Sequence, residues 1–134
     1  MSAKSTPVRI LVVDDDELFR TMLRAMLEQL GHTVTEASDG RHALEVYQAA
    51  EFDLVLTDLI MPGKEGIETI LALRKINREV KIIAMSGGGR VTSMDYLDIA
   101  RQVGAKRLLK KPFTQRELQV TIQSLQIPEA PSVP

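Results

Sequence analysis

The chain has 134 residues, of which 44% are hydrophobic and 26% are charged, values close to the average for globular domains. This length suits one domain, and the composition excludes a fibrous or wholly disordered chain. Lys and Arg number 17 against 18 Asp and Glu, so the formal net charge is −1 and offers no positive field for direct binding of nucleic acid or an anionic membrane. The absence of cysteine excludes disulfides, thiol catalysis and cysteine-ligated zinc.

Both ends of the chain differ in composition from the rest. Residues 127–134 hold three of the six prolines, and residues 1–6 are mostly polar, so we expect flexible ends at 1–6 and 127–134. The start carries no apolar run of the kind found in secretory signals, and no apolar run reaches the roughly 18 residues of a membrane span. These features predict a cytoplasmic protein with no membrane partner.

Between the ends, short apolar runs alternate with amphipathic stretches. In chain order the pattern predicts a strand at 8–13, a helix at 18–30, a partly polar edge strand at 32–36, a helix after 39–40, a strand at 53–57, a helix at 67–74, a strand at 80–85, a helix at 94–103, a short strand around 108–109 and a last helix from 114. Five strands alternating with five helices indicate an α/β fold with a doubly wound, five-stranded parallel sheet and helices on both faces.

Local signals mark several helix ends. Gly31 and Gly104 follow apolar helical repeats and are placed to end those helices. Asp16 precedes the first helix and is expected to cap its amino end. Thr114 and Glu117 have the spacing of a capping box, in which each side chain accepts the other residue's backbone N–H.

Charged and small residues follow four of the predicted strands. In chain order these segments are Asp14-Asp15-Asp16, then Asp58, then Ser86-Gly87-Gly88-Gly89, then Lys110-Lys111-Pro112. The carboxyl ends of parallel strands form the edge where ligands bind in sheets of this class. Crowded carboxylates raise each other's pKa unless a cation intervenes, and Mg²⁺ prefers one or two carboxylates, waters and a phosphate. Lys and Ser beside such a metal would complete a phosphoryl-binding site.

Each segment also has an ordinary structural interpretation. Asp58 precedes a Pro-Gly turn, the two lysines suit a solvated surface, and the glycines form neither a P-loop nor a dinucleotide-binding motif. His32 and His42 lie away from the predicted site, so we assign them packing or surface roles. The coincidence of all four segments at one sheet edge favours a shared functional site.

These residues resemble the receiver domain of two-component response regulators. The motifs that carry the resemblance are Val12-Val13-Asp14-Asp15, Thr57-Asp58-Leu59-Ile60-Met61-Pro62, Met85-Ser86-Gly87 and Lys111-Pro112-Phe113. They cover residues 7–125 in the expected order and spacing. The resemblance implies a flavodoxin-like strand order 2-1-3-4-5 and a stand-alone receiver similar to chemotaxis regulators, because the tail is too short for an output domain; a segment of a longer regulator stays an open alternative.

The resemblance also implies roles for single residues. Asp58 would be the phosphoacceptor, with Lys111 pairing with a phosphoryl oxygen and Ser86 donating its hydroxyl to the phosphorylated side chain. The implied Mg²⁺ ligands are Asp15, Asp58 and the backbone carbonyl of Ile60, with Asp14 acting through a coordinated water. The Lys111–Pro112 bond is expected to be cis.

Two positions depart from the family pattern. Many receivers have a Tyr or Phe on the fifth strand that moves with the Ser or Thr, and Leu108 stands at that position here. The segment from Ser86 to Gly104 is a few residues longer than usual, and its glycines predict a mobile loop. We therefore expect a conformational response in the loop 86–92 and the helix after it, rather than in the fifth strand.

The implied function is a phosphorylation switch rather than an enzyme acting on a separate substrate, since the domain would catalyse only its own phosphorylation and dephosphorylation. Its partners would be a histidine kinase or a histidine phosphotransferase and a downstream protein target. One alternative is a Mg²⁺-dependent phosphatase with an Asp nucleophile, but Ile60 stands where such enzymes usually carry a second Asp. A flavodoxin-like cofactor binder is another alternative, although the chain has no Trp and only two Tyr for flavin stacking.

Overall fold

The computed structural model describes residues 6–59, 65–87, 98 and 101–126. Its strands are β1 (Arg9–Val13), β2 (Thr33–Ala37), β3 (Leu54–Asp58), β4 (Ile82–Ser86) and β5 (Arg107–Lys110). Its helices are α1 (Glu17–Gln29), α2 (Gly40–Ala49), α3 (Glu65–Ile76) and α5 (Gln115–Gln126). Ile60, the glycine loop from residue 88 and most of the predicted helix 94–103 lie outside the described residues, as do residues 1–5 and 127–134.

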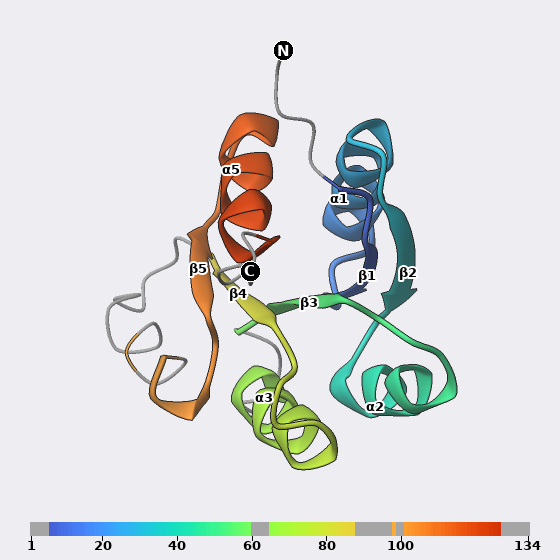
Figure 1. The fold of residues 1–134 in the computed structure, drawn as a ribbon, viewed down its shortest axis with the longest axis vertical. Helices are drawn as coiled ribbons and strands as arrows, with labels where there is room; N and C mark the ends of the chain where they lie inside the picture. Colours follow the sequence, from blue (N-terminus) through green and yellow to red (C-terminus); the bar gives the residue numbers. More distant parts are fainter. Residues whose placement is uncertain (1–5, 60–64, 88–97, 99–100, 127–134) are drawn as a thin grey trace, which may run out of the picture.

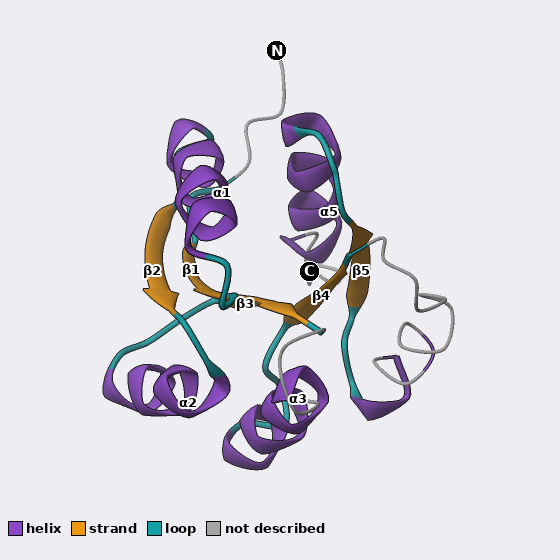
Figure 2. Cartoon of the chain, turned by 180° about the vertical axis from the view of Figure 1, so that it is seen from behind, coloured by secondary structure: helices purple, strands orange, loops and turns teal. Residues whose placement is uncertain are grey.

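The five strands form one parallel sheet in the order β2-β1-β3-β4-β5. Figure 1 shows α1 and α5 on one face of this sheet and α2 and α3 on the other, and Figure 2 shows the same arrangement from behind. The predicted fold class and the flavodoxin-like strand order are therefore confirmed, and the partly polar strand β2 lies at an edge as its composition indicated.

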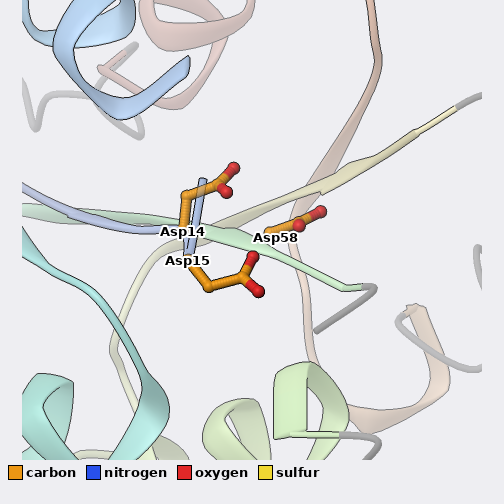
Figure 3. Close-up of side chains that lie close together, drawn as sticks. All are labelled: Asp14, Asp15 and Asp58. Atoms are coloured by element: carbon orange, nitrogen blue, oxygen red, sulfur yellow. The ribbon is translucent and has the colours of Figure 1, made fainter. Parts of the chain in front are cut away.

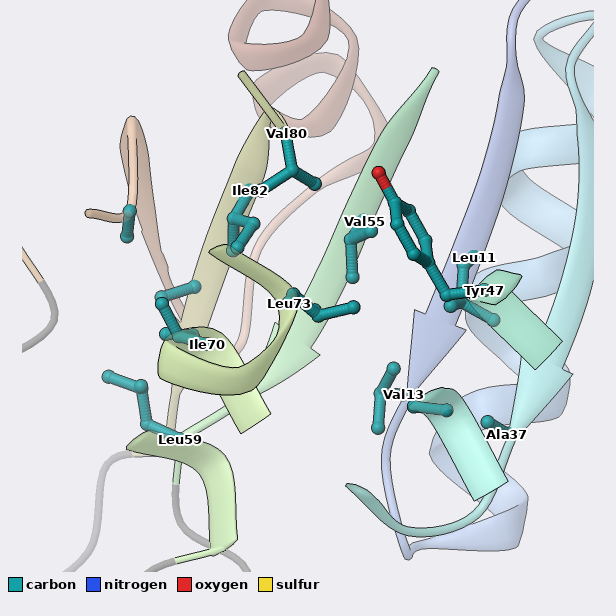
Figure 4. Close-up of a cluster of buried hydrophobic side chains, with 13 residues drawn as sticks. Leu11, Val13, Ala37, Tyr47, Val55, Leu59, Ile70, Leu73, Val80 and Ile82 are labelled. Carbon is teal, nitrogen blue, oxygen red and sulfur yellow. The ribbon is translucent and has the colours of Figure 1, made fainter. Parts of the chain in front are cut away.

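Successive side chains of a strand point to opposite faces, so the sheet has an apolar layer on each face. These two layers hold the helices against the sheet. One layer lies between the sheet and helices α2 and α3 (Figure 4), and it includes Leu11, Val13, Val55, Tyr47, Ile70, Leu73 and Ile82. The other lies between the sheet and helices α1 and α5, and it includes Ile10, Val12, Leu56, Leu23, Leu27, Leu118 and Ile122. Burial of the central strands on both faces explains why their sequences are mostly apolar and do not alternate with polar residues.

The helix ends follow the predicted signals. The Asp16 carboxylate accepts the backbone N–H of Phe19 at 3.2 Å, and it caps α1. Thr114 and Glu117 form the reciprocal capping box of α5, with N···O distances of 2.8 and 3.0 Å. Gly31 has φ = 100° directly after the cap residue of α1, a conformation that favours glycine.

The apolar residues that repeat along α1 cover more of the helix surface than the part that is buried. Leu18 and Met22 belong to the repeat, yet 83% and 47% of their surfaces are exposed. Leu23 and Leu27 are the residues of this helix that pack fully against the sheet.

Among the described helices, none has the length and apolar content to cross a bilayer.

His32 is buried at the entrance to β2 and has a structural role, as its position predicted. Its Nδ1 accepts the backbone N–H of Val8 at 3.1 Å, so this nitrogen carries no proton. Burial lowers the pKa of His32 below its usual value of 6.5, and a hydrogen bond with the Gln119 side chain opposes the shift more weakly. The neutral ring therefore links the starts of β1 and β2.

This environment predicts that folding stability depends on pH through His32. The unfolded chain keeps the ordinary pKa and takes up a proton first, so the contribution is complete about one unit above pH 6.5 and is lost as the pH falls through 6.5 toward the lowered folded pKa. We expect the free energy of unfolding, measured with urea, to decline between about pH 7.5 and 5.5, by at most about 1.4 kcal/mol per pH unit from this group. The variant His32→Asn keeps an acceptor for Val8 and should flatten the decline, whereas the exposed His42→Asn should not. An unchanged slope in His32→Asn would contradict this assignment.

Candidate functional site

Three carboxylates gather at the carboxyl edge of the sheet (Figure 3). Asp14 and Asp15 follow β1, and Asp58 ends the neighbouring strand β3, where its side chain lies beside theirs. One oxygen of each carboxylate lies within 4.8 Å of the others. Asp14 and Asp58 are buried, whereas Asp15 is exposed. The structure thus brings together three of the predicted acidic residues with one of them open to solvent.

Hydrogen bonds fix Asp14 on both of its carboxylate oxygens. Oδ1 accepts the backbone N–H of Asp16 at 2.9 Å, and Oδ2 accepts from Lys111 Nζ at 2.9 Å. The Asp14 backbone N–H donates to the Ala37 carbonyl at 3.2 Å, and its own carbonyl accepts from Arg20 Nη1 at 2.7 Å. A carboxylate held this way is suited to a positioning role, which agrees with the indirect metal contact expected for Asp14.

Lys111 reaches the same carboxylates from the segment after β5. Its Nζ lies 2.9 Å from Asp14 Oδ2 and 3.6 Å from Asp58 Oδ1. The Lys111 backbone N–H donates to the carbonyl of Ser86 at 2.8 Å, and the Lys111–Pro112 bond is cis as expected. Lys110, one residue earlier, is exposed. The structure therefore places one of the two adjacent lysines at the site.

The hydroxyl of Ser86 lies at the end of β4, the strand that follows β3 in the sheet. Ser86 is fully buried, and its Oγ has no hydrogen-bond partner among the described residues. A buried hydroxyl without a partner costs about 1–3 kcal/mol, so an unpaired one at a strand end indicates a place for a ligand. This orphaned donor fits the role that the sequence predicted for Ser86.

Aromatic side chains form a wall of the site that the sequence pattern did not reveal. The Phe19 ring lies under Lys111 Nζ, with 4.0 Å between the nitrogen and the ring centroid. Phe113 packs its edge on the same ring, with centroids 5.9 Å apart and planes at 87°. Phe19 belongs to the apolar repeat of the predicted helix 18–30 and packs against the apolar layer under α1 and α5, and only the pairing of distant segments places it beside the lysine as well.

An ionic network outside the site holds the loop after β1. The Glu36 carboxylate on β2 accepts from Arg20 Nε at 2.8 Å and from Arg24 Nη1 at 2.9 Å, both on α1. Hydrogen bonds from Arg24 and then Arg20 lower the pKa of Glu36 below its usual value. Since Arg20 also binds the Asp14 carbonyl, the network ties α1 and β2 to the acidic loop.

The donor set fits a hard divalent cation. Carboxylate oxygens of Asp14, Asp15 and Asp58 are the ligand type that Mg²⁺ prefers, and one of them is open to solvent so that waters can complete the coordination. The carbonyl of Ile60 lies outside the described residues, so its predicted metal contact stays a prediction. Leu108 is half-buried and packs against the apolar layer beneath α2 and α3, and it presents no polar atom.

Known proteins are similar to this chain over most of its length. The chemotaxis protein CheY of Thermotoga maritima is 37% identical over 106 residues, which cover 78% of this chain and 86% of that protein. The transcriptional regulatory protein CpxR of Escherichia coli is 35% identical over 117 residues, covering 87% of this chain and 48% of CpxR. The crystal structure of the response regulator TrrA from Thermotoga maritima superposes with a TM-score of 0.76 at 31% identity, covering 87% of this chain and 97% of TrrA.

The chain spans about half the length of the curated regulators such as CpxR that it matches, and nearly all of shorter ones such as CheY. The family described as response regulator receiver domain matches residues 10–123, which run from β1 into α5 and include the acidic edge of the sheet. Fold, carboxylate cluster and family match agree, and the chain belongs to the response regulator receiver domain family.

Proposed function

We propose that this receiver domain accepts a phosphoryl group on Asp58 and signals through the resulting change in its protein-binding surface. The observation that carries the proposal is the position of the Asp58 carboxylate, 5% exposed at the end of β3, beside two other carboxylates and the Lys111 ammonium. The TrrA protein, to which the chain is similar, was solved in complex with Mg²⁺–BeF, which supports a proposal that includes Mg²⁺.

In the proposed reaction, a carboxylate oxygen of Asp58 attacks the phosphorus of a phosphohistidine on a histidine kinase or histidine phosphotransferase. The phosphorus–nitrogen bond breaks, its electron pair returns to the imidazole, and an aspartyl phosphate forms. Lys111 pairs with a phosphoryl oxygen, and the Ser86 hydroxyl donates to another. Later attack by water breaks the new phosphorus–oxygen bond and releases inorganic phosphate with the Asp58 carboxylate regenerated. Transfer of this kind needs mainly positioning and charge neutralisation.

Mg²⁺ would be held by Asp15 and Asp58, with Asp14 acting through a water. When bound, it supplies two positive charges that offset those of the carboxylates and the phosphoryl oxygens. The domain's own residues do the rest: Lys111 Nζ, from the segment after β5, lies 3.6 Å from Asp58 Oδ1, and Ser86 at the end of β4 offers a buried hydroxyl with no partner among the described residues. On this proposal the domain is not an enzyme for a separate substrate, and it works in the cytoplasm, where ATP-driven kinases form phosphohistidine.

Acetyl phosphate with Mg²⁺ tests the phosphoacceptor directly. We expect intact-mass spectrometry to show one added phosphoryl group on the wild-type protein and none on Asp58→Asn, which keeps the shape of the side chain but loses the nucleophilic carboxylate. Asp16→Asn is the matched control, because asparagine caps a helix as well as aspartate does. This variant should be labelled like the wild type.

Two results would count against the proposal. Equal labelling of Asp58→Asn would exclude Asp58 as the acceptor. Repeated release of phosphate from small phosphate esters, at many turnovers per molecule, would favour the alternative of a Mg²⁺-dependent phosphatase with an aspartate nucleophile. Transcriptional regulation belongs to the full-length CpxR protein, and the proposal for this chain concerns the phosphoryl switch alone.

A further inference from the structure

We propose that Phe19 is a positioning residue that holds the Lys111 ammonium in place for the phosphoryl group when a divalent cation occupies the carboxylates. The inference rests on the proposed function, in which Lys111 pairs with a phosphoryl oxygen. It starts from the contacts of Nζ, which lies between two carboxylates and the face of one aromatic ring.

The ring contact has the geometry of a cation–π interaction. The Lys111 nitrogen lies 4.0 Å from the Phe19 centroid, well inside the roughly 6 Å at which a ring face attracts a cation. Only 18% of the Lys111 side chain is exposed, so the contact is largely shielded from water, which strengthens it.

Neighbouring residues hold Phe19 on both sides. The Asp16 carboxylate accepts its backbone N–H at 3.2 Å and fixes the first turn of α1, from which the ring projects. Phe113 contacts the ring edge-on, and Phe113 follows Lys111 by two residues. The segment that carries the ammonium therefore also carries the side chain that supports its aromatic partner.

The carboxylates cannot serve as the sole anchor for Lys111 throughout the reaction. Lys111 donates a hydrogen bond to Asp14, which is one of the three residues whose oxygens lie close enough to share a metal ion. A divalent cation there would compete for the same negative charge and repel the ammonium. The lysine stem is flexible, with about 2 kcal/mol of rotamer entropy, so the ammonium would then be free to leave the site. A neutral ring is unaffected by the metal, and it retains the ammonium beside Asp58.

Nuclear magnetic resonance of Lys111 tests the contact itself. The ε-methylene group is bonded to Nζ, which lies over the ring face, so we expect its proton resonances to be shifted upfield in the wild type. We expect the shift to persist when Mg²⁺ is added alone, to be retained in Phe19→Tyr and to be absent in Phe19→Leu. An upfield shift that disappears on saturation with Mg²⁺ would overturn the proposal.

Binding measurements test the consequence. Beryllofluoride mimics the phosphoryl group, and its affinity at saturating Mg²⁺ should fall by about fivefold in Phe19→Leu and stay within about twofold in Phe19→Tyr, which keeps the ring face. Mg²⁺ affinity measured alone should not fall in Phe19→Leu, because a phenylalanine ring offers no oxygen ligand to the metal. Met22→Leu, an exposed apolar change on the same helix, is the control and should alter neither affinity.

Equal losses in Phe19→Tyr and Phe19→Leu, or a parallel loss of Mg²⁺ affinity, would show that Phe19 acts only through packing and would overturn the proposal. The proposed function fails by a different result, which is a wild-type protein that binds no beryllofluoride and takes up no phosphoryl group. In that event the resonance measurement still decides whether Phe19 holds Lys111.

Discussion

Replacing Gly66 with alanine is expected to lower the free energy of unfolding by about 3 kcal/mol, at the upper end of the usual cost of overpacking. Gly66 is in the first turn of α3, and that turn lies directly on the backbone that follows β3. A Cβ atom at this position would stand 2.5 Å from the carbonyl oxygens of Asp58 and Leu59 and 2.6 Å from the Leu59 Cα. All three atoms belong to the backbone, so no side-chain rotation relieves the contact.

The direction of the stability change in Gly66→Ala distinguishes overpacking from an effect of helix propensity. Alanine in place of glycine within a helix ordinarily stabilises it by about 1 kcal/mol. Gly87 is the matched control, because a Cβ built there meets nothing within 4 Å. Urea unfolding should show Gly87→Ala within about 0.5 kcal/mol of the wild type. If Gly66→Ala is as stable as the wild type, α3 does not approach the end of β3 as closely as the structure shows.

The same substitution should disturb the site, since Asp58 is one of the residues whose backbone the new methyl group would press on. We expect weaker labelling by acetyl phosphate in Gly66→Ala than in Gly87→Ala under conditions where both are folded. Close approach of a helix to a strand end is a tertiary contact, and the local pattern around Gly66 contains no sign of it. The role of Gly66 was therefore not predictable from the sequence.

Other parts of the fold were accessible from local patterns. The alternation of apolar strands with amphipathic helices depends on side-chain periods of 2 and 3.6 residues, and turn and cap residues such as Gly31 and Asp16 act within a few positions. Strand order depends on which strands pair. Strand β1 lies between β2 and β3, and the residues that pair are far apart in the chain. Periodicity predicted a parallel sheet, and the family resemblance was needed for its order.

The residues of the site likewise divide into those that a local pattern predicts and those that depend on tertiary contacts. Asp14, Asp15, Asp58 and the pair Lys110-Lys111 were predictable because charged residues after buried strands converge at one edge of a parallel sheet, and the family resemblance was needed to choose Lys111. Phe19 was not predictable, because an apolar residue at helical spacing has the same pattern whether it faces the core or a lysine. Ser86 could be proposed from its place at the end of a predicted strand, but only the structure shows that its hydroxyl lacks a partner among the described residues.

Removing the charge of Lys111 should destabilise the protein and abolish its phosphoryl response, while it increases the affinity for Mg²⁺. Lys111 is the cation that the described residues pair with Asp14 and Asp58, and Asp14 is fully buried. Lys111→Met keeps most of the stem but leaves the Asp14 charge without this partner, which for a buried pair costs about 3–5 kcal/mol. Lys110→Met, at the exposed neighbouring position, should change the unfolding free energy by less than about 0.5 kcal/mol.

Measurements with Mg²⁺ separate the effects of Lys111→Met on stability, on metal affinity and on the phosphoryl response. In Lys111→Met the metal no longer competes with an ammonium for Asp14, so titration should show tighter Mg²⁺ binding than in the wild type. By linkage, a given Mg²⁺ concentration should then raise the thermal midpoint of the variant more than that of the wild type. Beryllofluoride should nevertheless bind weakly at saturating Mg²⁺, because the phosphoryl oxygen has lost its cation. Equal Mg²⁺ affinities in both proteins would mean that Lys111 and the metal do not share the Asp14 carboxylate, and unchanged beryllofluoride binding would remove Lys111 from the proposed reaction.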